Sequence, residues 1–359
     1  MTEIAEPLDP VAAVVHPDPY PYYARLRRER PLYLDSGLGL WVAATHETVE
    51  AALRHPALRV RPPAELVPRA LIGTAAGEVF ARLVRMNDGD FHVRHKPAVE
   101  QAARRFSLAD VAHAAATAAL DLAARVDANA LLTTLPVQAM ARLLRVPAGL
   151  LDATTRWVEA FVQGIAPQAS PEAIARANEA AIQLMAQGES QGLGAVQSAN
   201  RIAMMQQALD ATAGLVGNTV RLLRDRPQLV ASPENWRAIV AEVARWDAPV
   251  QNTRRFAAAD LSLGGQEIAQ GQGVLVLLAS ANRDQALNTN PDVFDPARIE
   301  RRSMSFGAGP HGCPGDAIAI EIAAAGLEAL HAARPLDELF GPCTGFRPLA
   351  NARIPVFAN

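Results

Sequence analysis

The chain has 359 residues, of which 50% are hydrophobic, 20% are charged and only 5% are aromatic. This composition allows a sizeable core, excludes disorder and collagen-like structure, and favours helices over a β-sandwich. The net charge of −3 leaves no basic surface for nucleic acid, and no apolar run reaches the ~18 residues that cross a bilayer. Two cysteines cannot form a secreted disulfide framework, and the N-terminus lacks a signal-peptide pattern. We therefore expect a soluble cytoplasmic protein without nucleic-acid or membrane partners.

The N-terminal part of the chain combines short helices with short strands. Residues 20–30 have a helical pattern, and Thr45 is placed to cap a second helix that ends before the next proline. Between these helices, residues 32–34 and 40–42 flank a glycine-containing turn, which predicts a hairpin. A proline-rich stretch at 62–73 predicts a loop.

The middle of the chain, residues 90–223, is helical almost throughout. It ends in a long apolar helix at 204–223, and a further helix is expected at 236–246. Prolines and glycines predict breaks near Pro136, near Pro147, at 167–171 and at 188–194.

The C-terminal part changes to short strands and loops. Its expected elements are strands at 261–263 and 273–278, a loop at 282–312, a helix at 314–330 and a strand-like stretch at 346–357. Helices in the middle with small β pieces at both ends, and without alternating βαβ units, predict a mainly α fold with small β-sheets (α+β).

A glycine-rich loop around Cys313, residues 306–315, is the most informative segment. It formally matches a dinucleotide fingerprint, but no buried strand precedes it, as that motif requires. His311 and Cys313 supply only two of the four ligands of a structural zinc ion. Two interpretations of Cys313 remain: a small buried side chain, or a thiolate held at a helix N-terminus, which is a suitable axial ligand for heme iron.

The loop resembles the heme-binding signature of the cytochromes P450, and the resemblance extends over nearly the whole chain. The matching positions are Phe306, Gly307, Gly309, His311, Cys313 and Gly315. The resemblance implies the cytochrome P450 fold, of the soluble bacterial type, in a single domain of residues 1–359. It also implies heme b (iron protoporphyrin IX) as cofactor, with Cys313 as the ligand of the iron and its loop neighbours as heme-binding residues.

Glu242 and Arg245 lie three residues apart on one face of a predicted helix. Taken alone, this spacing indicates a surface ion pair. It also resembles the family's Glu-x-x-Arg motif, and Arg298 matches the third member of that cluster. The resemblance then implies a buried structural cluster that holds the cysteine loop in place.

The two propionates of a heme need cationic partners. The resemblance maps this role onto His92 and Lys96, with lysine in place of the usual arginine, and onto Arg255 and His311. Lysine donates as a point charge and lacks the bidentate fork of arginine. For His92 and Lys96, a solvated helix face is the alternative.

The long helix has a small and polar side formed by Gln207, Asp210, Ala211, Gly214 and Asn218. Such a side is typical of close helix packing, whereas the resemblance implies a surface over the iron on which Asp210 relays protons. The threonine that usually follows the acid is replaced by Ala211, and Thr212 is displaced by one residue, about 100° round the helix. Gln207 replaces the first small residue of the motif and is a candidate source of the missing hydrogen bond.

Substrate contacts are expected from several segments by their position in the family. The candidates are Gly214, Val250, Asn252, Thr253 and Leu349. The polar members would give the pocket a polar side, although a loop position without a special role is the alternative for each of them.

The resemblance implies O₂-dependent monooxygenation of a small organic substrate from secondary metabolism by a monomeric enzyme. Electrons would come from a separate ferredoxin and ferredoxin reductase. Ala211 keeps open a non-hydroxylating reaction: oxidative coupling, nitrogen-group chemistry or peroxygenation. A heme-binding protein without catalysis is the alternative from another class. Because the chain is short for the family, we expect shortening before the long helix, around 188–199, and a trimmed lid over the distal pocket.

Overall fold

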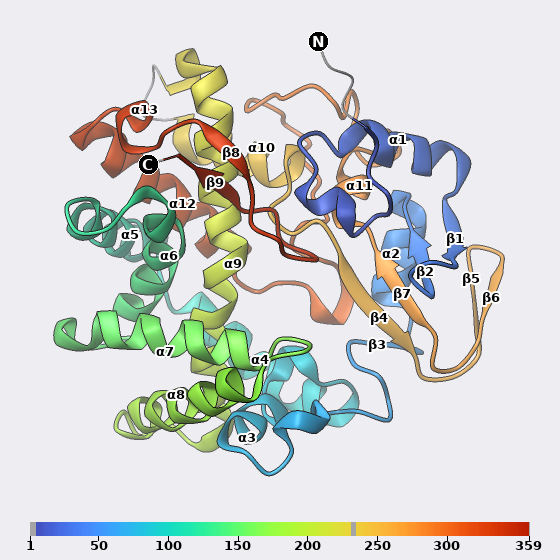
Figure 1. Cartoon of the computed structure of the whole chain (residues 1–359), viewed down its shortest axis with the longest axis horizontal. Coiled ribbons are helices and arrows are strands. Elements are labelled where there is room, and N and C mark those ends of the chain that lie inside the picture. The colour runs from blue at the N-terminus through green and yellow to red at the C-terminus, as the bar shows by residue number, and fades with distance from the viewer. Residues whose placement is uncertain (1–4, 231–234, 359) are drawn as a thin grey trace. The chain divides into compact units, whose positions relative to one another are not determined.

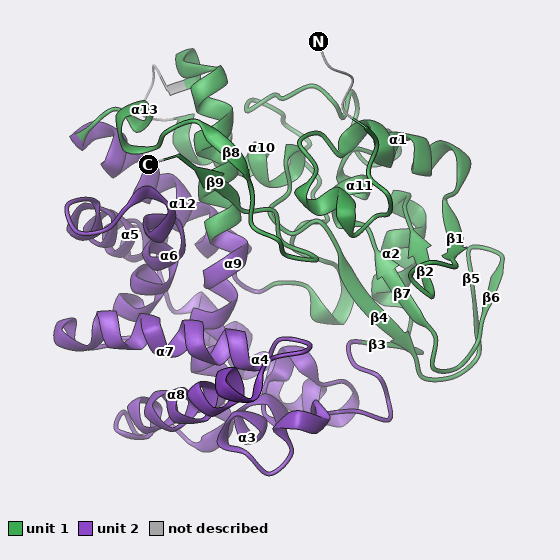
Figure 2. Ribbon diagram, viewed as in Figure 1, with its two compact units in different colours: residues 1–59, 213–313, 334–359 green, residues 60–212, 314–333 purple. Residues whose placement is uncertain are grey.

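The computed structural model describes residues 5–230 and 235–358, and it is mainly helical with three small β-sheets in these parts of the chain (Figure 1). The predicted α+β fold class is thereby confirmed. The chain forms two compact units, coloured separately in Figure 2. Unit 1 contains Met1–Arg59, Ala213–Cys313 and Arg334–Asn359, and unit 2 contains Val60–Thr212 and Pro314–Ala333. Within the described residues, no helix is both long enough and apolar enough to cross a membrane.

A five-stranded sheet organises unit 1. Its strands, in spatial order, are β1 (Leu32–Asp35), β2 (Leu40–Ala43), β7 (Gly273–Val276), β4 (Thr253–Ala257) and β3 (Leu58–Arg59). β2 and β7 are parallel, and the other neighbouring pairs are antiparallel. The hairpin of β1 and β2 lies where the sequence predicts it.

The central strand β7 is buried on both faces, since successive side chains of a strand point to opposite sides. Val274 and Val276 pack on one side, with α2 (His46–Arg54) and the hairpin of β5 (Leu261–Leu263) and β6 (Gln266–Ile268). Leu275 packs on the other side, with α1 (Tyr20–Glu29). The uninterrupted apolar run of β7 therefore contributes side chains to the hydrophobic core on both faces of the unit 1 sheet.

Unit 1 also contains helices and a second pair of strands outside this sheet. They are α10 (Trp236–Trp246), α11 (Leu278–Asn282), α13 (Leu336–Leu339) and the antiparallel strands β8 (Cys343–Phe346) and β9 (Pro355–Phe357). The expected strand-like stretch at 346–357 is therefore two short strands with an irregular segment between them.

Unit 2 is a bundle of helices. Its helices of seven or more residues are α3 (Ala75–Ala81), α4 (Gly89–Arg104), α5 (Leu108–Ala123), α6 (Ala128–Leu143), α7 (Leu151–Gly164), α8 (Pro171–Glu189) and α12 (Asp316–Ala333). α5 packs against α12, and α7 packs against α8 (Figure 1). A Cβ at Gly164 would lie 2.2 Å from the Cβ of Ala177, so this glycine permits the close approach of α7 and α8.

The helix α9 (Ala195–Asp225) is 31 residues long and contributes residues to both units. It begins well before the predicted start at residue 204, and only residues 190–194 separate it from α8.

The predicted break at Pro136 is wrong. α6 runs through this proline, which lies buried in the middle of the helix together with its neighbours Leu135 and Val137. Proline removes one intrahelical hydrogen bond, but apolar packing on several sides keeps the helix continuous. The sequence analysis missed two helix boundaries. One lies at Ser107, whose hydroxyl accepts a hydrogen bond from the backbone nitrogen of Asp110. The other lies at Asp127, whose carboxylate accepts hydrogen bonds from the backbone nitrogens of Asn129 and Ala130.

Candidate functional site

The Cys313 loop is closed by its own backbone. The nitrogen of Cys313 donates to the carbonyl of Phe306 (2.9 Å). Gly307 and Gly309 adopt φ values of +69° and +68°, in the left-handed region that favours glycine. A Cβ at Gly309 would lie 3.1 Å from the carbonyl oxygen of Leu53, at the end of α2, so a side chain has little room there.

The Cys313 side chain is exposed at the end of this loop, and neither cysteine of the chain is in a disulfide. The interpretation of Cys313 as a small buried side chain is therefore wrong. Phe306, Gly307 and His311 are half-buried, with His311 on the short helical turn η7 (Gly309–His311). A thiol presented by glycines with positive φ, whose backbone a flat ligand can approach closely, fits a heme ligand.

Two polar side chains fasten the residues that precede Cys313. Asn282 accepts a hydrogen bond from the nitrogen of Met304 (2.6 Å) and donates to the hydroxyl of Ser305 (2.8 Å). That hydroxyl donates in turn to the carbonyl of Ala244 on α10 (2.6 Å). The sequence analysis missed Asn282 and Ser305, because neither belongs to a motif and their contact joins distant segments.

Glu242 and Arg245 form a fully buried ion pair on α10, the helix that contains Ala244. Nη2 of Arg245 lies 2.6 Å from Oε1 of Glu242, and both side chains are 0% exposed. Arg298 and Arg301 also contact the carboxylate, through their Nε atoms at 3.3 Å and 2.9 Å. The surface ion pair is thus the wrong alternative, and Arg301 is a member of the cluster that the sequence analysis did not include.

Burial alone would raise the pKa of the Glu242 carboxyl, but the hydrogen bonds of Arg245 and Arg301 and the charge of Arg245 hold it below its usual range. Glu242 is therefore ionised in the folded protein. Arg245, which is paired with Glu242, also donates to the backbone carbonyls of Pro291 (2.7 Å) and Val293 (3.1 Å). The cluster thereby binds the long loop that leads to the cysteine.

Arg255 lies on β4, a strand that the sequence analysis did not predict. Its side chain is buried, and Nη1 donates to the carbonyl of Arg254 (2.8 Å) and to the hydroxyl of Thr253 (3.4 Å). Thr253, one of the substrate candidates, thus touches a predicted propionate partner.

In unit 2, His92 and Lys96 lie one turn apart on α4. His92 is 6% exposed and Lys96 is half-buried. A solvated helix face is therefore the wrong alternative for His92.

The predicted proton-relay residues of α9 differ in their exposure. Gln207 is exposed, and its Nε2 donates to the carbonyl of Ala203 (3.1 Å). Asp210 and Ala211 are half-buried, whereas Thr212 is only 2% exposed. The hydroxyl-bearing residue is thus the one that packs into the protein interior.

The comparisons with known proteins agree on one family. The cytochrome P450 family model matches residues 235–329. The 20-oxo-5-O-mycaminosyltylactone 23-monooxygenase of Streptomyces fradiae is 29% identical over 92% of this chain and 87% of its own length. Linalool 8-monooxygenase of Pseudomonas putida is 27% identical over 84% of this chain and 85% of its own length. The crystal structure of CalO2 has the same fold, with a TM-score of 0.81, 23% identity and 98% of both chains covered. The chain is a cytochrome P450.

Membership of this family makes the protein a heme-dependent oxidoreductase of the monooxygenase class. The glycine loop of Cys313 and the buried cluster on α10 both lie in or near the segment that the family model matches. The recognition of this family from the sequence is thereby confirmed.

Two residues predicted to face the active site of this P450 pack inside unit 1 instead. A Cβ at Gly214 would lie 2.7 Å from the carbonyl oxygen of Arg353 and 3.0 Å from Pro249. Asn218 is 0% exposed and donates to the carbonyl of Asp247 (2.9 Å). At these two positions the structure shows the close helix packing that was the alternative to a substrate surface.

The other substrate candidates of unit 1 connect the segment after α10 to the C-terminal segment. Asn252 is buried and donates to the carbonyl of Ala350 (2.9 Å), and Val250 forms a β-bridge with Ala352. Leu349 lies beside these contacts in sequence and is half-buried. The backbone of Val250 and the side-chain amide of Asn252 thus both bind the C-terminal segment.

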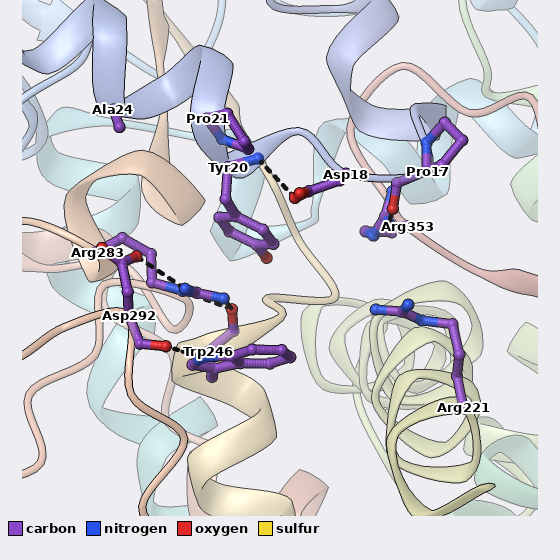
Figure 3. Close-up of a pocket in the computed structure, with 10 residues that line it drawn as sticks. All are labelled: Pro17, Asp18, Tyr20, Pro21, Ala24, Arg221, Trp246, Arg283, Asp292 and Arg353. Carbon is purple, nitrogen blue, oxygen red and sulfur yellow. Dashed lines mark hydrogen bonds and ion pairs between the residues drawn. The ribbon is translucent and has the colours of Figure 1, made fainter. Parts of the chain in front are cut away.

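The P450 also has a pocket of about 500 Å³ in unit 1, and it contains none of the predicted site residues (Figure 3). Tyr20 and Trp246 form part of its wall, together with three arginines. Arg283 donates to the carbonyl of Trp246 and to Asp292, as Figure 3 shows. Arg353 donates to Asp247 and to three backbone carbonyls. These guanidinium groups are committed to structural contacts, and we assign the pocket no role in catalysis.

Proposed function

We propose that this P450 binds heme b with Cys313 as the iron ligand and inserts one oxygen atom from O₂ into a small organic substrate. The observation that supports it best is the exposed thiol at the end of a closed glycine loop, with a buried ion cluster fixing the loop's approach. A bound heme supplies the oxygen activation, and the axial thiolate favours O–O cleavage. The chain's own residues hold the group, exclude water and deliver protons.

In this proposal, the propionates are held by His92, Lys96, Arg255 and His311. The burial of His92 and Arg255 supports it, since donors shielded from water bind a carboxylate more strongly. Lys96 acts as a point charge. Asp210 moves protons from solvent, and its half-buried position on α9 suits a group that must meet both water and the distal side.

The substrate proposed here is a small secondary metabolite, in keeping with relatives whose names specify a macrolide intermediate and linalool. Val250, Thr253 and Leu349 are proposed to contact it. Electrons come from a separate ferredoxin-type donor and its reductase, and the enzyme acts as a cytoplasmic monomer.

A second candidate reaction has one specific observation in its favour. Ala211 has no hydroxyl at the position after Asp210, and the hydroxyl of Thr212 is on a buried residue. A heme-thiolate site without that donor fits oxidative coupling, nitrogen-group chemistry or peroxygenation.

The reduced, CO-bound absorption spectrum tests the proposed ligand. We expect the red-shifted Soret band of a heme-thiolate in the wild type and its loss in Cys313→Ala. Cys343→Ala is the matched control, since it removes the chain's other thiol, and it should keep the band. A band that survives in Cys313→Ala would overturn the assignment of the iron ligand.

A further inference from the structure

The pocket of Figure 3 lies entirely within unit 1 and is large enough for a small molecule. Its volume of about 500 Å³ falls within the ~300–1,000 Å³ that is typical of small-molecule sites. Part of its wall is apolar and comes from the N-terminal segment, from α1 and from the end of α10. The side chains of this apolar part are those of Pro17, Tyr20, Pro21, Ala24 and Trp246. The pocket can therefore take a small molecule with a flat, apolar body.

Two of the three arginines in the wall are neutralised by carboxylates. Arg283 pairs with Asp292 (2.9 Å) and Arg353 pairs with Asp247 (3.1 Å), and the two arginine side chains are 4% and 0% exposed. Each nitrogen atom of both guanidinium groups donates a hydrogen bond to a protein oxygen. Neither group is thus left with a nitrogen for a ligand.

Arg221, the third arginine, differs from these two. Its Nη2 atom donates to Oδ2 of Asp247 (2.6 Å), the carboxylate that Arg353 also contacts. Within the described parts of the chain, neither Nη1 nor the buried Nε has a hydrogen-bond partner. The Arg221 side chain is 28% exposed, and in Figure 3 its guanidinium points from α9 into the pocket. Arg221 therefore has unused donors at the pocket.

The charges around Arg221 favour an anion. Arg221 and Arg353 share the single carboxylate of Asp247, so this group carries one positive charge in excess. Burial alone would lower the pKa of the Arg221 guanidinium, but Asp247 raises it above its usual value. Asp18 also lines the pocket, but it is exposed and accepts a hydrogen bond from the backbone nitrogen of Tyr20 (3.3 Å), and water screens its charge.

We propose that this pocket binds a small aromatic carboxylate, whose anionic group accepts hydrogen bonds from Arg221 and whose ring lies against the apolar part of the wall. A guanidinium forms charge-assisted hydrogen bonds with a carboxylate, and these are stronger than bonds between neutral groups. The flat side chains of Tyr20, Trp246 and the prolines suit a rigid ring. None of the residues proposed to hold the heme or the substrate lines this pocket, so the inference is independent of the proposed function.

The first experiment is a calorimetric titration of the heme-loaded enzyme with 2-naphthoate and with 2-naphthamide, which match in shape and differ in charge. The enzyme is first saturated with 4-phenylimidazole, which coordinates the iron and occupies the open face of the heme. Since a hydrogen bond to a charged group contributes about ten- to a hundredfold in affinity, we expect the wild type to bind the acid at least about tenfold more tightly than the amide. Arg221→Gln should bring that ratio close to one, and Arg221→Lys should keep part of it.

Arg28→Gln is the matched control. It removes the same charge from α1 in the same unit, where the Arg28 side chain is 69% exposed, and it should leave the acid-to-amide ratio unchanged.

A second variant leaves the contacts of Asp247 intact, since Arg221→Gln removes one of them. Ala24→Trp places a large ring in the apolar part of the pocket and should weaken the binding of acid and amide together. Circular dichroism shows whether the variant is folded. Unchanged acid binding in folded Ala24→Trp would overturn the proposal, whatever the fate of Arg221→Gln.

Urea unfolding provides a readout that does not depend on the titration. The wall of the pocket comes from segments that meet only in the folded chain, so a ligand bound there stabilises the native state by mass action. Saturating 2-naphthoate should raise the midpoint of unfolding of the wild type and leave that of Arg221→Gln unchanged.

Three results with the wild type would overturn the proposal. One is the absence of acid binding up to about 1 mM, the weak end of specific affinity. Another is equal binding of acid and amide. The third is acid binding that occurs only without 4-phenylimidazole, which would place the acid at the heme.

Discussion

At the scale of single residues, the distal side of α9 is the most unusual part of this P450. Asp210 and Ala211 are half-buried, and Thr212 is 2% exposed. Consecutive helix positions differ by about 100°, so the threonine cannot replace a hydroxyl at position 211 by a small shift. Our hypothesis is that the hydrogen bond missing at Ala211 comes from the substrate, from an ordered water or from Gln207.

Restoring the threonine tests this explanation. We expect Ala211→Thr to improve neither the rate nor the product formed per NADH consumed, because the wild type already has a donor supplied by another group. A positioned proton donor contributes about 100-fold or more, so an enzyme without one would be visibly uncoupled. Coupling is measured with surrogate electron donors and a substrate found by the spin-state screen. Poor coupling in the wild type together with efficient coupling in Ala211→Thr would contradict the hypothesis. The same coupling measurement on Gln207→Leu shows whether the Gln207 amide is the donor.

At the scale of elements, the Glu242 cluster joins α10 to the loop that leads to Cys313. One carboxylate contacts Arg245, Arg298 and Arg301, and it also accepts a hydrogen bond from the backbone nitrogen of Asp295 (3.2 Å). A buried ion cluster of this kind adds little net stability over an apolar core, but the loss of one partner leaves buried charges uncompensated.

Glu242→Gln should therefore lower the free energy of unfolding by about 3–5 kcal/mol. The measurement is urea unfolding of the heme-loaded protein at neutral pH. The exposed pair of Glu78 and Arg82 provides the control, since Glu78→Gln should cost no more than about 1 kcal/mol. Equal losses in the two variants would mean that the buried cluster is not a structural element of the cysteine loop.

At the scale of the whole molecule, unit 1 is assembled from three separate stretches of sequence. Asp247, at the end of α10, connects them. Its carboxylate accepts hydrogen bonds from Tyr20 (2.8 Å), Arg221 (2.6 Å) and Arg353 (3.1 Å). Arg353 also donates to the carbonyl of Val14 (2.9 Å), which joins the two ends of the chain.

Asp247 should make the stability of the protein sensitive to acid. Burial alone would raise the pKa of its carboxyl, but Arg353 and Arg221 hold it below the usual value of about 3.9. Its contribution to stability is then fully present above that value and is lost as the pH falls through the lower pKa of the folded state.

Asp247→Asn should be less stable than the wild type at neutral pH and should lose less stability between about pH 5 and pH 3. Urea unfolding across this range measures both effects, with the exposed Asp18→Asn as control. If the stability of Asp247→Asn falls with acid as steeply as that of the wild type, other carboxyls, Glu242 among them, account for the acid sensitivity.

Local patterns in the sequence were sufficient for the elements and motifs that short-range chemistry controls. The cap of α2 at Thr45, the hairpin of β1 and β2, the bounds of α10 and the glycine loop of Cys313 all follow from neighbouring residues. The family could be recognised from the sequence for the same reason, since its signature lies in one short loop.

Other features depend on contacts between segments that are far apart in the chain. Pro136 lies inside a helix because buried packing compensates for the missing hydrogen bond. β4 is a strand because β7 and β3 pair with it, and Asn282 acts on the cysteine loop from a distant helix. Whether a side chain is buried, and which partner it meets, is decided by tertiary packing, because the free energy of a charge or a proline depends on surroundings that distant residues supply.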